Sequence, residues 1–309
     1  MYVVGNNLSC CGGDGLVISG VKGGAIENNV SYYANYLGRE GYYNASIWVF
    51  ASEDVLFQYN EAAYTYMRNG GQDAQGFDID NACRNIIFRY NYAHHNEGGG
   101  LLLCDNTTSI DKYDANGNLI QSGASVSGNW GDNYIYGNVF AYNGIVNDPE
   151  RSAFITVSRK VSNVYIFNNT IVMSGEIKGQ NIVNVEQDGC SYHYYYNNVF
   201  YSEKNSSAKF DLFGEFTCYF NGNLFYNVST NGLFLTNQNA RTYDPKMTGL
   251  DGRETSDFNG FDALSFFVPQ ESKVWTDGVN LPEKALEAKL NEDALGNKTG
   301  NVHLGALVG

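Results

Sequence analysis

The sequence predicts an all-β chain that folds as a parallel β-helix, a solenoid whose successive coils stack short strands into long sheets. Three observations predict this fold. Short apolar phrases that contain an asparagine recur at regular intervals along most of the chain. A second short apolar stretch precedes most of these asparagines by about eleven residues. The composition, with 24 tyrosines and 18 phenylalanines but only 4 prolines, favours many regular strands.

The asparagine phrases give the length of one coil. Each phrase has its asparagine at the fourth position, and they are Ile26–Val30, Phe57–Glu61, Phe88–Tyr92, Ile135–Val139, Ile166–Thr170, Tyr195–Val199 and Phe220–Leu224. The asparagines are 25 to 31 residues apart, except for a gap of 47 residues between Asn91 and Asn138. We expect them to stack at a tight turn, with their amides hydrogen-bonded along the solenoid.

The long gap predicts an insertion at about Asn106–Asn133. Within it, Asp114–Asn118 resembles part of a calcium loop but lacks the full ligand pattern, and its Asn116-Gly117 pair is typical of a hairpin turn. Because the insertion directly follows Asp105, we expect it to form a lid or wall of a site.

The repeat fades after about Ala240, so we expect a β-helix over residues 1–240 and a last coil with a C-terminal cap over residues 241–309. Pro282–Leu290 is rich in helix formers and begins with proline, which predicts a short helix. Gly305–Val308 is expected to be a last strand or part of the cap, because a solenoid needs its end covered.

Charge and hydropathy exclude several classes of partner. A net charge of −14 with a pI near 4.6 disfavours nucleic acid and anionic membranes. No apolar run is long enough for a membrane span. Met1–Gly5 shows no signal peptide, so we expect that N-terminal coils and an export signal are missing from this chain. The six cysteines have no zinc-like spacing, and we expect most to be small buried residues, with a disulfide left open.

The strongest candidate site is the strand at Gly76–Asp80. Its apolar Phe77 and Ile79 share one face, and Asp78 and Asp80 share the other. Neighbouring carboxylates repel each other and raise one pKa, so a strand selected only for stability would avoid them. Their alternative interpretation is solvated surface or a structural cation site.

Aligning the first strand of each coil on its inward apolar pair predicts columns of outward residues. The expected pairs are Val17/Ser19, Trp48/Phe50, Asp78/Asp80, Leu103/Asp105, Thr156/Ser158, Asn184/Glu186 and Asp211/Phe213. Because neighbouring strands are about 4.8 Å apart, Asp80 and Asp105 should be direct neighbours. Trp48 and Phe50, on the other side of the aspartates, could pack against sugar rings, or Trp48 could pack under a loop.

Five further residues complete the candidate site. Glu61 and Glu97 are catalytic candidates, and His94, His95 and Arg68 are candidates for substrate binding. Glu61 occupies a position that is uncharged in the other coils, where Val30, Tyr92, Val139, Thr170, Val199 and Leu224 stand. The two histidines could instead be turn or surface residues, and Glu97 precedes three glycines in a stretch that needs polar residues anyway.

Residues 47–105 resemble the right-handed parallel β-helix proteins of the pectate-lyase-like superfamily, in particular its glycosidase-like secreted members. The resemblance rests on Trp48-Val49, Asn60-Glu61, Gln75–Asp80 and Arg89–Gly99, and Asp293–Ala306 is similar to the closing segment of such proteins. It implies a right-handed β-helix, and it implies that paired carboxylates on neighbouring coils, here Asp78, Asp80 and Asp105, act in catalysis. The superfamily hosts several reactions, so the fold does not choose among them.

The leading hypothesis is a secreted glycoside hydrolase that cleaves a polysaccharide or oligosaccharide with two carboxyl groups and requires no cofactor. One alternative is a polysaccharide lyase in which Asp78, Asp80 and Asp105 bind Ca²⁺ and an arginine removes a proton. No lysine occurs between Lys22 and Lys112, which counts against a lyase. Another alternative is a glycan-binding or adhesive module. With Asp80 and Asp105 as the working pair, we expect retention of anomeric configuration; with Glu61 and Asp78 or Asp80, inversion.

Overall fold

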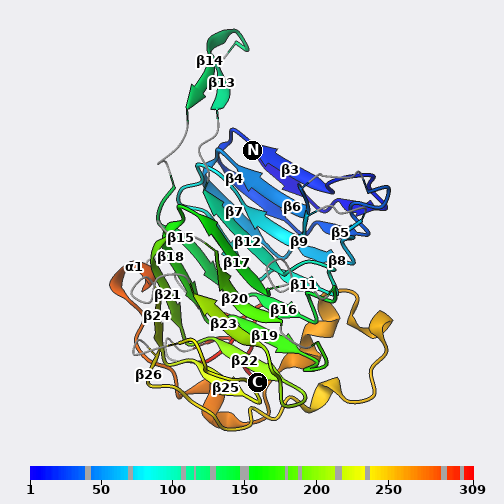
Figure 1. The fold of residues 1–309 in the computed structure, drawn as a ribbon, viewed down its shortest axis with the longest axis vertical. Helices are drawn as coiled ribbons and strands as arrows, with labels where there is room; N and C mark the ends of the chain where they lie inside the picture. The colour runs from blue at the N-terminus through cyan, green and yellow to red at the C-terminus, as the bar shows by residue number, and fades with distance from the viewer. Residues whose placement is uncertain are drawn as a thin grey trace.

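The computed structural model describes residues 1–38, 43–68, 72–105, 109–114, 116–125, 130–146, 153–177, 180–186, 190–212, 218–233, 237–286, 291–299 and 303–309. The chain is a right-handed parallel β-helix with three long sheets, which confirms the predicted fold class (Figure 1). Every strand pairing in these three sheets is parallel, and every coil except those at the C-terminal end contributes one strand to each sheet in turn.

In each sheet, the strands of successive coils lie side by side in chain order. Sheet A contains β1 (Tyr2–Val4), β4 (Lys22–Glu27), β7 (Glu53–Gln58), β10 (Ile87–Arg89), β15 (Asn133–Tyr136), β18 (Ser162–Phe167), β21 (Ser191–Tyr196), β24 (Cys218–Asn221) and β26 (Asn237–Gln238). Sheet B contains β2 (Asn7–Ser9), β5 (Val30–Tyr32), β8 (Glu61–Ala63), β11 (Tyr92–His94), β16 (Val139–Ala141), β19 (Thr170–Met173), β22 (Val199–Ser202) and β25 (Leu224–Tyr226). Sheet C contains β3 (Leu16–Ser19), β6 (Tyr43–Phe50), β9 (Gln72–Ile79), β12 (Leu101–Asp105), β17 (Ile155–Arg159), β20 (Asn181–Val185) and β23 (Lys209–Leu212).

The predicted asparagine ladder forms the turn between sheets A and B. The Nδ2 group of each asparagine donates to Oδ1 of the asparagine in the next coil at 2.9 to 3.1 Å, through Asn29, Asn60, Asn91, Asn138, Asn169, Asn198 and Asn223. Asn6 extends the ladder into the first coil. A second, shorter ladder joins Asn96 to Asn143 at the turn after sheet B. Because these buried amides are satisfied by one another, they fix the register of successive coils.

The inside of the solenoid is filled by the inward side chains of the three sheets. Large members of this core are Phe57, Phe77, Phe88, Phe140, Phe200 and Phe220. Tight packing of such side chains contributes most of the stability of a solenoid, since each coil buries its apolar face only against its neighbours.

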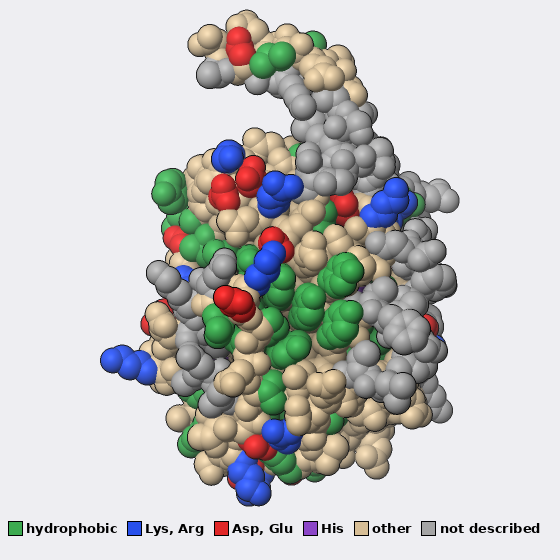
Figure 2. Space-filling view, turned by 90° about the vertical axis from the view of Figure 1, so that its left-hand side faces the viewer, with side chains coloured by type: hydrophobic (Ala, Val, Ile, Leu, Met, Phe, Trp, Pro, Cys, Tyr) green, Lys and Arg blue, Asp and Glu red, His purple; other side chains and the backbone are tan. Residues whose placement is uncertain are grey.

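A row of stacked tyrosines lies on the outer face of sheet A. Tyr134, Tyr165, Tyr194 and Tyr219 pair in register, and successive ring centroids are 5.1 to 5.3 Å apart. The side of the molecule where β15, β18, β21 and β24 lie faces the viewer in Figure 2, which shows hydrophobic side chains gathered in its middle. Stacking of identical rings adds to the hydrogen bonding between coils.

The insertion is a hairpin of β13 (Ser109–Tyr113) and β14 (Leu119–Ser125). The oxygen Oδ1 of Asp114 accepts from the N–H groups of Asn116 and Asn118, so the predicted hairpin turn is confirmed. The hairpin projects beyond the body of the molecule in both views (Figures 1 and 2). Its described part therefore does not cover a site as we expected; residues 106–108 and 126–129 lie outside the described residues.

The C-terminal segment covers the outer face of sheet B. It contains the 3₁₀ helices η2 (Thr248–Leu250), η3 (Thr255–Phe258), η4 (Phe261–Phe267) and η5 (Ser272–Trp275), and the short helix α1 (Glu283–Leu286). A second apolar cluster joins this segment to outward residues of sheets A and B. Helix α1 falls within the predicted Pro282–Leu290, of which residues 287–290 lie outside the described residues. Gly305–Val308 is buried and has no strand conformation, so it belongs to the C-terminal cap. Its Ala306 N–H donates to Thr170 Oγ1 of sheet B at 2.9 Å.

All six cysteines lie within the described residues and carry free thiols, with Cys83, Cys190 and Cys218 buried. In the described part of the chain, no helix has the length and apolar character that crossing a membrane requires.

Candidate functional site

Four predicted residues lie together on the outer face of sheet C. Trp48 of β6 pairs directly with Asp78 of β9, which confirms that the aromatic and acidic residues are neighbours. The rings of Trp48 and Phe50 stack with their centroids 5.4 Å apart. Asp80 follows β9 and continues the ladder, since its N–H donates to the carbonyl oxygen of Val49 at 2.8 Å. This face therefore combines a flat apolar surface with two carboxyl groups.

The predicted register of β12 is wrong by one residue. Leu102, and not Leu103, pairs with Asp78, and Leu103 lies in the core. A shift of one residue moves every side chain of a strand to the other face. Cys104 therefore takes the place beside Asp80 that we expected for Asp105. The carboxylate of Asp105, 4% exposed, instead accepts from the Ala82 N–H at 3.3 Å.

Asp78 is buried without a hydrogen-bond partner for Oδ1 among the described residues. Its side chain is only 8% exposed. Burial, reinforced by the charges of Asp80, Asp73 and Asp14, raises the pKa of Asp78 well above its usual range. The Asp78 carboxyl group therefore favours its protonated form and can donate a proton.

Asp80 has surroundings that support a negative charge better. Burial raises its pKa too, but the Asn81 N–H, 2.7 Å from Oδ1, and the Cys104 thiol both donate to its carboxylate. The guanidinium of Arg159 also lowers the pKa of Asp80. Since hydrogen bonds to the ionised form stabilise it, Asp80 is the carboxyl group of the two that ionises more readily.

Several contributors to this site were missing from the predicted set. Cys104 was not predicted because the expected register of β12 was shifted by one residue. Asp73 was not predicted because it precedes the alternating part of β9 and lies at a β-bulge, where its φ angle is 72°. Thr156 of β17 pairs with Leu102, in the same row as Trp48 and Asp78. The hydroxyl of Thr156 and the indole N–H of Trp48 are buried and have no partner among the described residues.

Glu61 does not lie on this face, because β8 belongs to sheet B and the C-terminal segment covers it. Its side chain is 1% exposed, and Oε1 accepts from the Tyr32 hydroxyl at 2.5 Å and from the Gly260 N–H at 2.8 Å. His94 Nε2 lies 3.0 Å from the same oxygen. Glu61 therefore fixes the segment around Gly260 to the β-helix.

The two predicted histidines belong to the Glu61 cluster. The Nδ1 atoms of His94 and His95 are 3.0 Å apart. Burial lowers the pKa of both, that of His95 to about 3, to which the neighbouring His94 contributes. Since His94 Nε2 donates to Glu61, its Nδ1 accepts from the Nδ1–H of His95 when both rings are neutral. The pair is thus part of the hydrogen-bonded network around Glu61 on sheet B. It lies apart from Asp78 and Asp80, which are on sheet C.

Glu97 and Arg68 lie at the turn between sheets B and C. The Glu97 carboxylate accepts from the N–H of Met67, which holds the loop that carries Arg68. The guanidinium of Arg68 packs 4.1 Å from the ring centroid of Tyr66 and 5.4 Å from that of Tyr36. These contacts support the loop.

Within the described ranges, no group of three or more His, Cys, Asp or Glu side chains is arranged to hold a metal ion. Asp105 does not share the outward row of Asp78, because Leu102 and not Leu103 pairs with Asp78.

Comparisons with known proteins point to a glycosidase only distantly. No protein-family model matches the chain, so membership of the pectate-lyase-like superfamily stays a prediction. The chain is 28% identical over 149 residues to a protein named lacto-N-biosidase from Bifidobacterium longum subsp. longum, a match that covers 43% of this chain and only 9% of that protein. A solved structure of the full-length QnrB1, a plasmid-mediated fluoroquinolone resistance protein, aligns with 76% of this chain and 95% of that one at 11% identity. Its TM-score is 0.17, too low to support any argument.

Proposed function

We propose that the chain is part of a secreted glycoside hydrolase whose active site is the row of Trp48, Phe50, Asp78 and Asp80 on sheet C. The observation that carries the proposal is the contrast between the two carboxyl groups: Asp78 is buried beside Trp48 without a partner for Oδ1 among the described residues, whereas Asp80 receives hydrogen bonds. Two carboxyl groups with different proton affinity are what hydrolysis of a glycosidic bond needs.

In this mechanism, the Asp78 carboxyl group gives its proton to the glycosidic oxygen as the bond to the anomeric carbon breaks. The Asp80 carboxylate attacks the anomeric carbon or removes a proton from an attacking water. The Asn81 N–H and the Cys104 thiol hold Asp80 in its reactive orientation. The rings of Trp48 and Phe50 contact the C–H face of a sugar, and the Trp48 indole N–H and the Thr156 hydroxyl bind sugar hydroxyls.

The expected retention of configuration rested on Asp80 and Asp105 as direct neighbours, which the register of β12 does not provide. Asp78 and Asp80 are two residues apart on one strand, so their Cα atoms are about 6.6 Å apart. The first-formed anomer, observed by NMR, distinguishes retention from inversion for this pair.

The distant relative supplies the first substrate to test. We propose an oligosaccharide as the substrate, and the name of the relative makes a lacto-N-biosyl glycoside the starting member of a panel of neutral oligosaccharides and polysaccharides. Release of reducing sugar by the full chain supports the proposal. An unsaturated sugar product would identify a lyase instead, and glycan binding without cleavage across the panel would reject an enzyme of either kind.

A further inference from the structure

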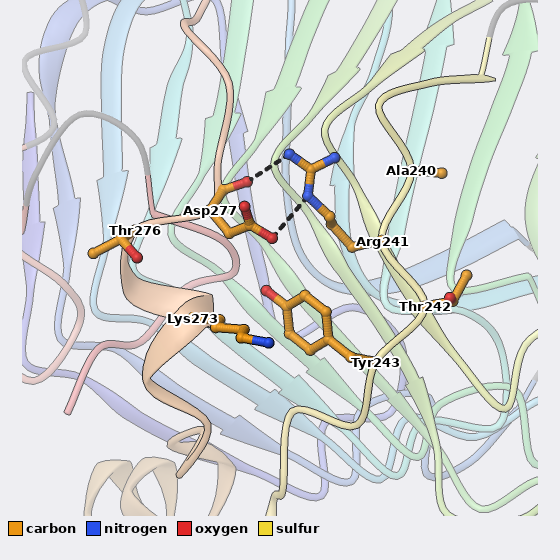
Figure 3. Close-up of a pocket in the computed structure, with 7 residues that line it drawn as sticks. All are labelled: Ala240, Arg241, Thr242, Tyr243, Lys273, Thr276 and Asp277. Carbon is orange, nitrogen blue, oxygen red and sulfur yellow. Dashed lines mark hydrogen bonds and ion pairs between the residues drawn. The ribbon is translucent and has the colours of Figure 1, made fainter.

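A separate hollow lies in the C-terminal part of the chain, between the stretch at Ala240–Tyr243 and the region of η5 (Figure 3). Its volume is about 580 Å³, within the range of small-molecule sites. The lining residues are Ala240, Arg241, Thr242, Tyr243, Lys273, Thr276 and Asp277. None of them belongs to sheet C, so this hollow is distinct from the row of Trp48, Phe50, Asp78 and Asp80, which we call the acidic row.

Arg241 is held in a fixed orientation at this hollow. Its Nε–H donates to Asp277 Oδ2 at 2.8 Å, one Nη2–H donates to the Asp277 carbonyl oxygen at 3.1 Å, and Nη1 donates to the carbonyl oxygen of Asn239 (Figure 3). A guanidinium has five N–H donors, so one N–H on each terminal nitrogen has no partner within the described residues. Such a pair of donors on a rigid plane fits a carboxylate.

Lys273 makes the charge of the hollow positive. The Asp277 charge is balanced by Arg241, and Lys273 forms no ion pair within the described residues. The nearby Glu271 is paired with Lys246. Lys273 Nζ lies 5.8 Å from the ring centroid of Tyr243, which places the ammonium group at the aromatic wall. The lining residues thus carry two cationic side chains, Arg241 and Lys273, against one carboxylate, Asp277, and this balance favours an anion.

Tyr243 and the threonines suit a sugar ring. Burial, the charge of the neighbouring Asp277 and a hydrogen bond from the phenol to that carboxylate raise the pKa of Tyr243, so the ring stays uncharged. Its ring offers an apolar surface, and Thr242 and Thr276 add hydroxyl groups from two sides of the hollow. An anion without a ring, such as acetate, would use only the cationic groups.

We propose that this hollow binds a sugar that carries a carboxylate. The carboxylate contacts Arg241 and Lys273, and the sugar ring lies against Tyr243. This second site does not depend on the acidic row, so it stands or falls separately from the proposed hydrolase activity. It would hold an acidic glycan on the chain at a place other than sheet C.

The binding test uses the full chain with three probes that separate charge from ring contacts. Isothermal titration at pH 7 and low salt is carried out with glucuronate, glucose and acetate. We expect saturable binding of glucuronate, and binding of glucose and acetate that is about tenfold weaker or more, because each lacks one set of contacts. Equal affinity for glucose and glucuronate, or no binding of glucuronate, overturns the proposal.

Two variants and a matched control locate the binding. Lys273→Gln and Tyr243→Ala are each expected to weaken glucuronate binding about tenfold. Lys204→Gln removes an exposed lysine that is paired with Glu176 outside the hollow, and should leave the affinity unchanged. Arg241 is kept, because its substitution would also remove the contacts to Asp277 and Asn239. Unchanged affinity in both test variants, with their folding verified by circular dichroism, would place glucuronate elsewhere and refute the assignment.

Discussion

Asp78 and Asp80 are two residues apart on the outer face of sheet C, and the carboxylate of Asp80 is held by two donors, the Asn81 N–H and the Cys104 thiol. Asp78 Oδ1 has no partner in the described part of the chain. Two like groups on one strand thus differ in proton affinity because of their surroundings, which is the basis of the roles we propose for them.

Trp48→Ala is expected to raise KM about tenfold for the best substrate of the panel with a much smaller change in kcat. The indole beside Asp78 offers binding surface for a sugar, and removing it takes away contacts that ground state and transition state share. Val17→Ala, one coil further along the same row, is the control and should behave as the parent chain. A loss confined to kcat would show that Trp48 acts on the chemical step.

Asp78→Asn is expected to increase the free energy of unfolding at pH 7 but not at pH 3.5. Burial raises the pKa of Asp78 above the value of 3.8 that it has when unfolded. Ionisation in the unfolded chain therefore costs stability as the pH rises above that value, and asparagine removes this cost. Urea unfolding at both pH values measures it. If the variant is less stable at pH 7 by the same amount as at pH 3.5, the Asp78 carboxyl group is not buried uncharged.

Asn138→Asp is expected to destabilise the β-helix by about 3 kcal/mol or more. The Asn138 Nδ2 group donates to Asn169 Oδ1, to the Phe88 carbonyl oxygen and to the Tyr136 carbonyl oxygen, and aspartate has no such donor. Asn6→Asp makes the same change at the exposed end of the ladder and should cost less than about 1 kcal/mol. Equal losses in the two variants would remove the ladder from the explanation of stability.

Glu61→Ala is expected to cost about 3 kcal/mol, because it leaves three donors unpaired, the buried one on His94 and the partly buried ones on Tyr32 and Gly260. Hydrogen exchange should speed up selectively in residues 255–267, which Glu61 fixes to sheet B. Glu61→Gln keeps an acceptor oxygen and should cost less. Exchange that speeds up equally in sheets A and C would show that Glu61 supports the whole fold and not this attachment.

The same cluster predicts loss of stability in acid. Burial lowers the pKa of His95 to about 3 from the 6.5 of the unfolded chain. The unfolded chain therefore binds a proton first, and the stability contributed by the neutral ring is lost as the pH falls from about 6.5 towards 3. His95→Gln should flatten the fall in unfolding free energy over this range, measured by urea unfolding at several pH values. A variant with the parent's pH dependence would contradict this.

The repeating part of the fold could be predicted because each coil uses the same residues for the same purpose. The asparagines from Asn29 to Asn223 occupy one position of every coil, so their spacing reveals both coil length and register. The register of β12 could not be predicted in this way. Leu101, Leu102 and Leu103 are all apolar, so alternation allows either phase, and only the pairing with β9 shows that Leu102 points outward.

The contact between Trp48 and Asp78 could be predicted, whereas the surroundings of Glu61 could not, because only the first depends on the coil repeat. Trp48 and Asp78 are neighbours through the coil repeat, which is visible in the sequence. Glu61 interacts with Gly260, which is 199 residues away in a segment without repeats. Its unusual charge was visible, but the segment that covers it was not. The sequence therefore indicated that Glu61 is unusual, but it did not indicate that Glu61 contacts the C-terminal segment at Gly260.

The most direct test of the central claim compares Asp78→Asn and Asp80→Asn on two aryl glycosides of the same sugar, one with a poor and one with an activated leaving group. A leaving group of low pKa needs no proton, so Asp78→Asn should lose about 10²- to 10⁴-fold in kcat/KM on the poor leaving group but little on the activated one. Asp80→Asn should lose activity on both, and Asp211→Asn, an exposed carboxylate on the same face, on neither. Equal losses for Asp78→Asn on both substrates, or an active Asp80→Asn variant, would contradict the account.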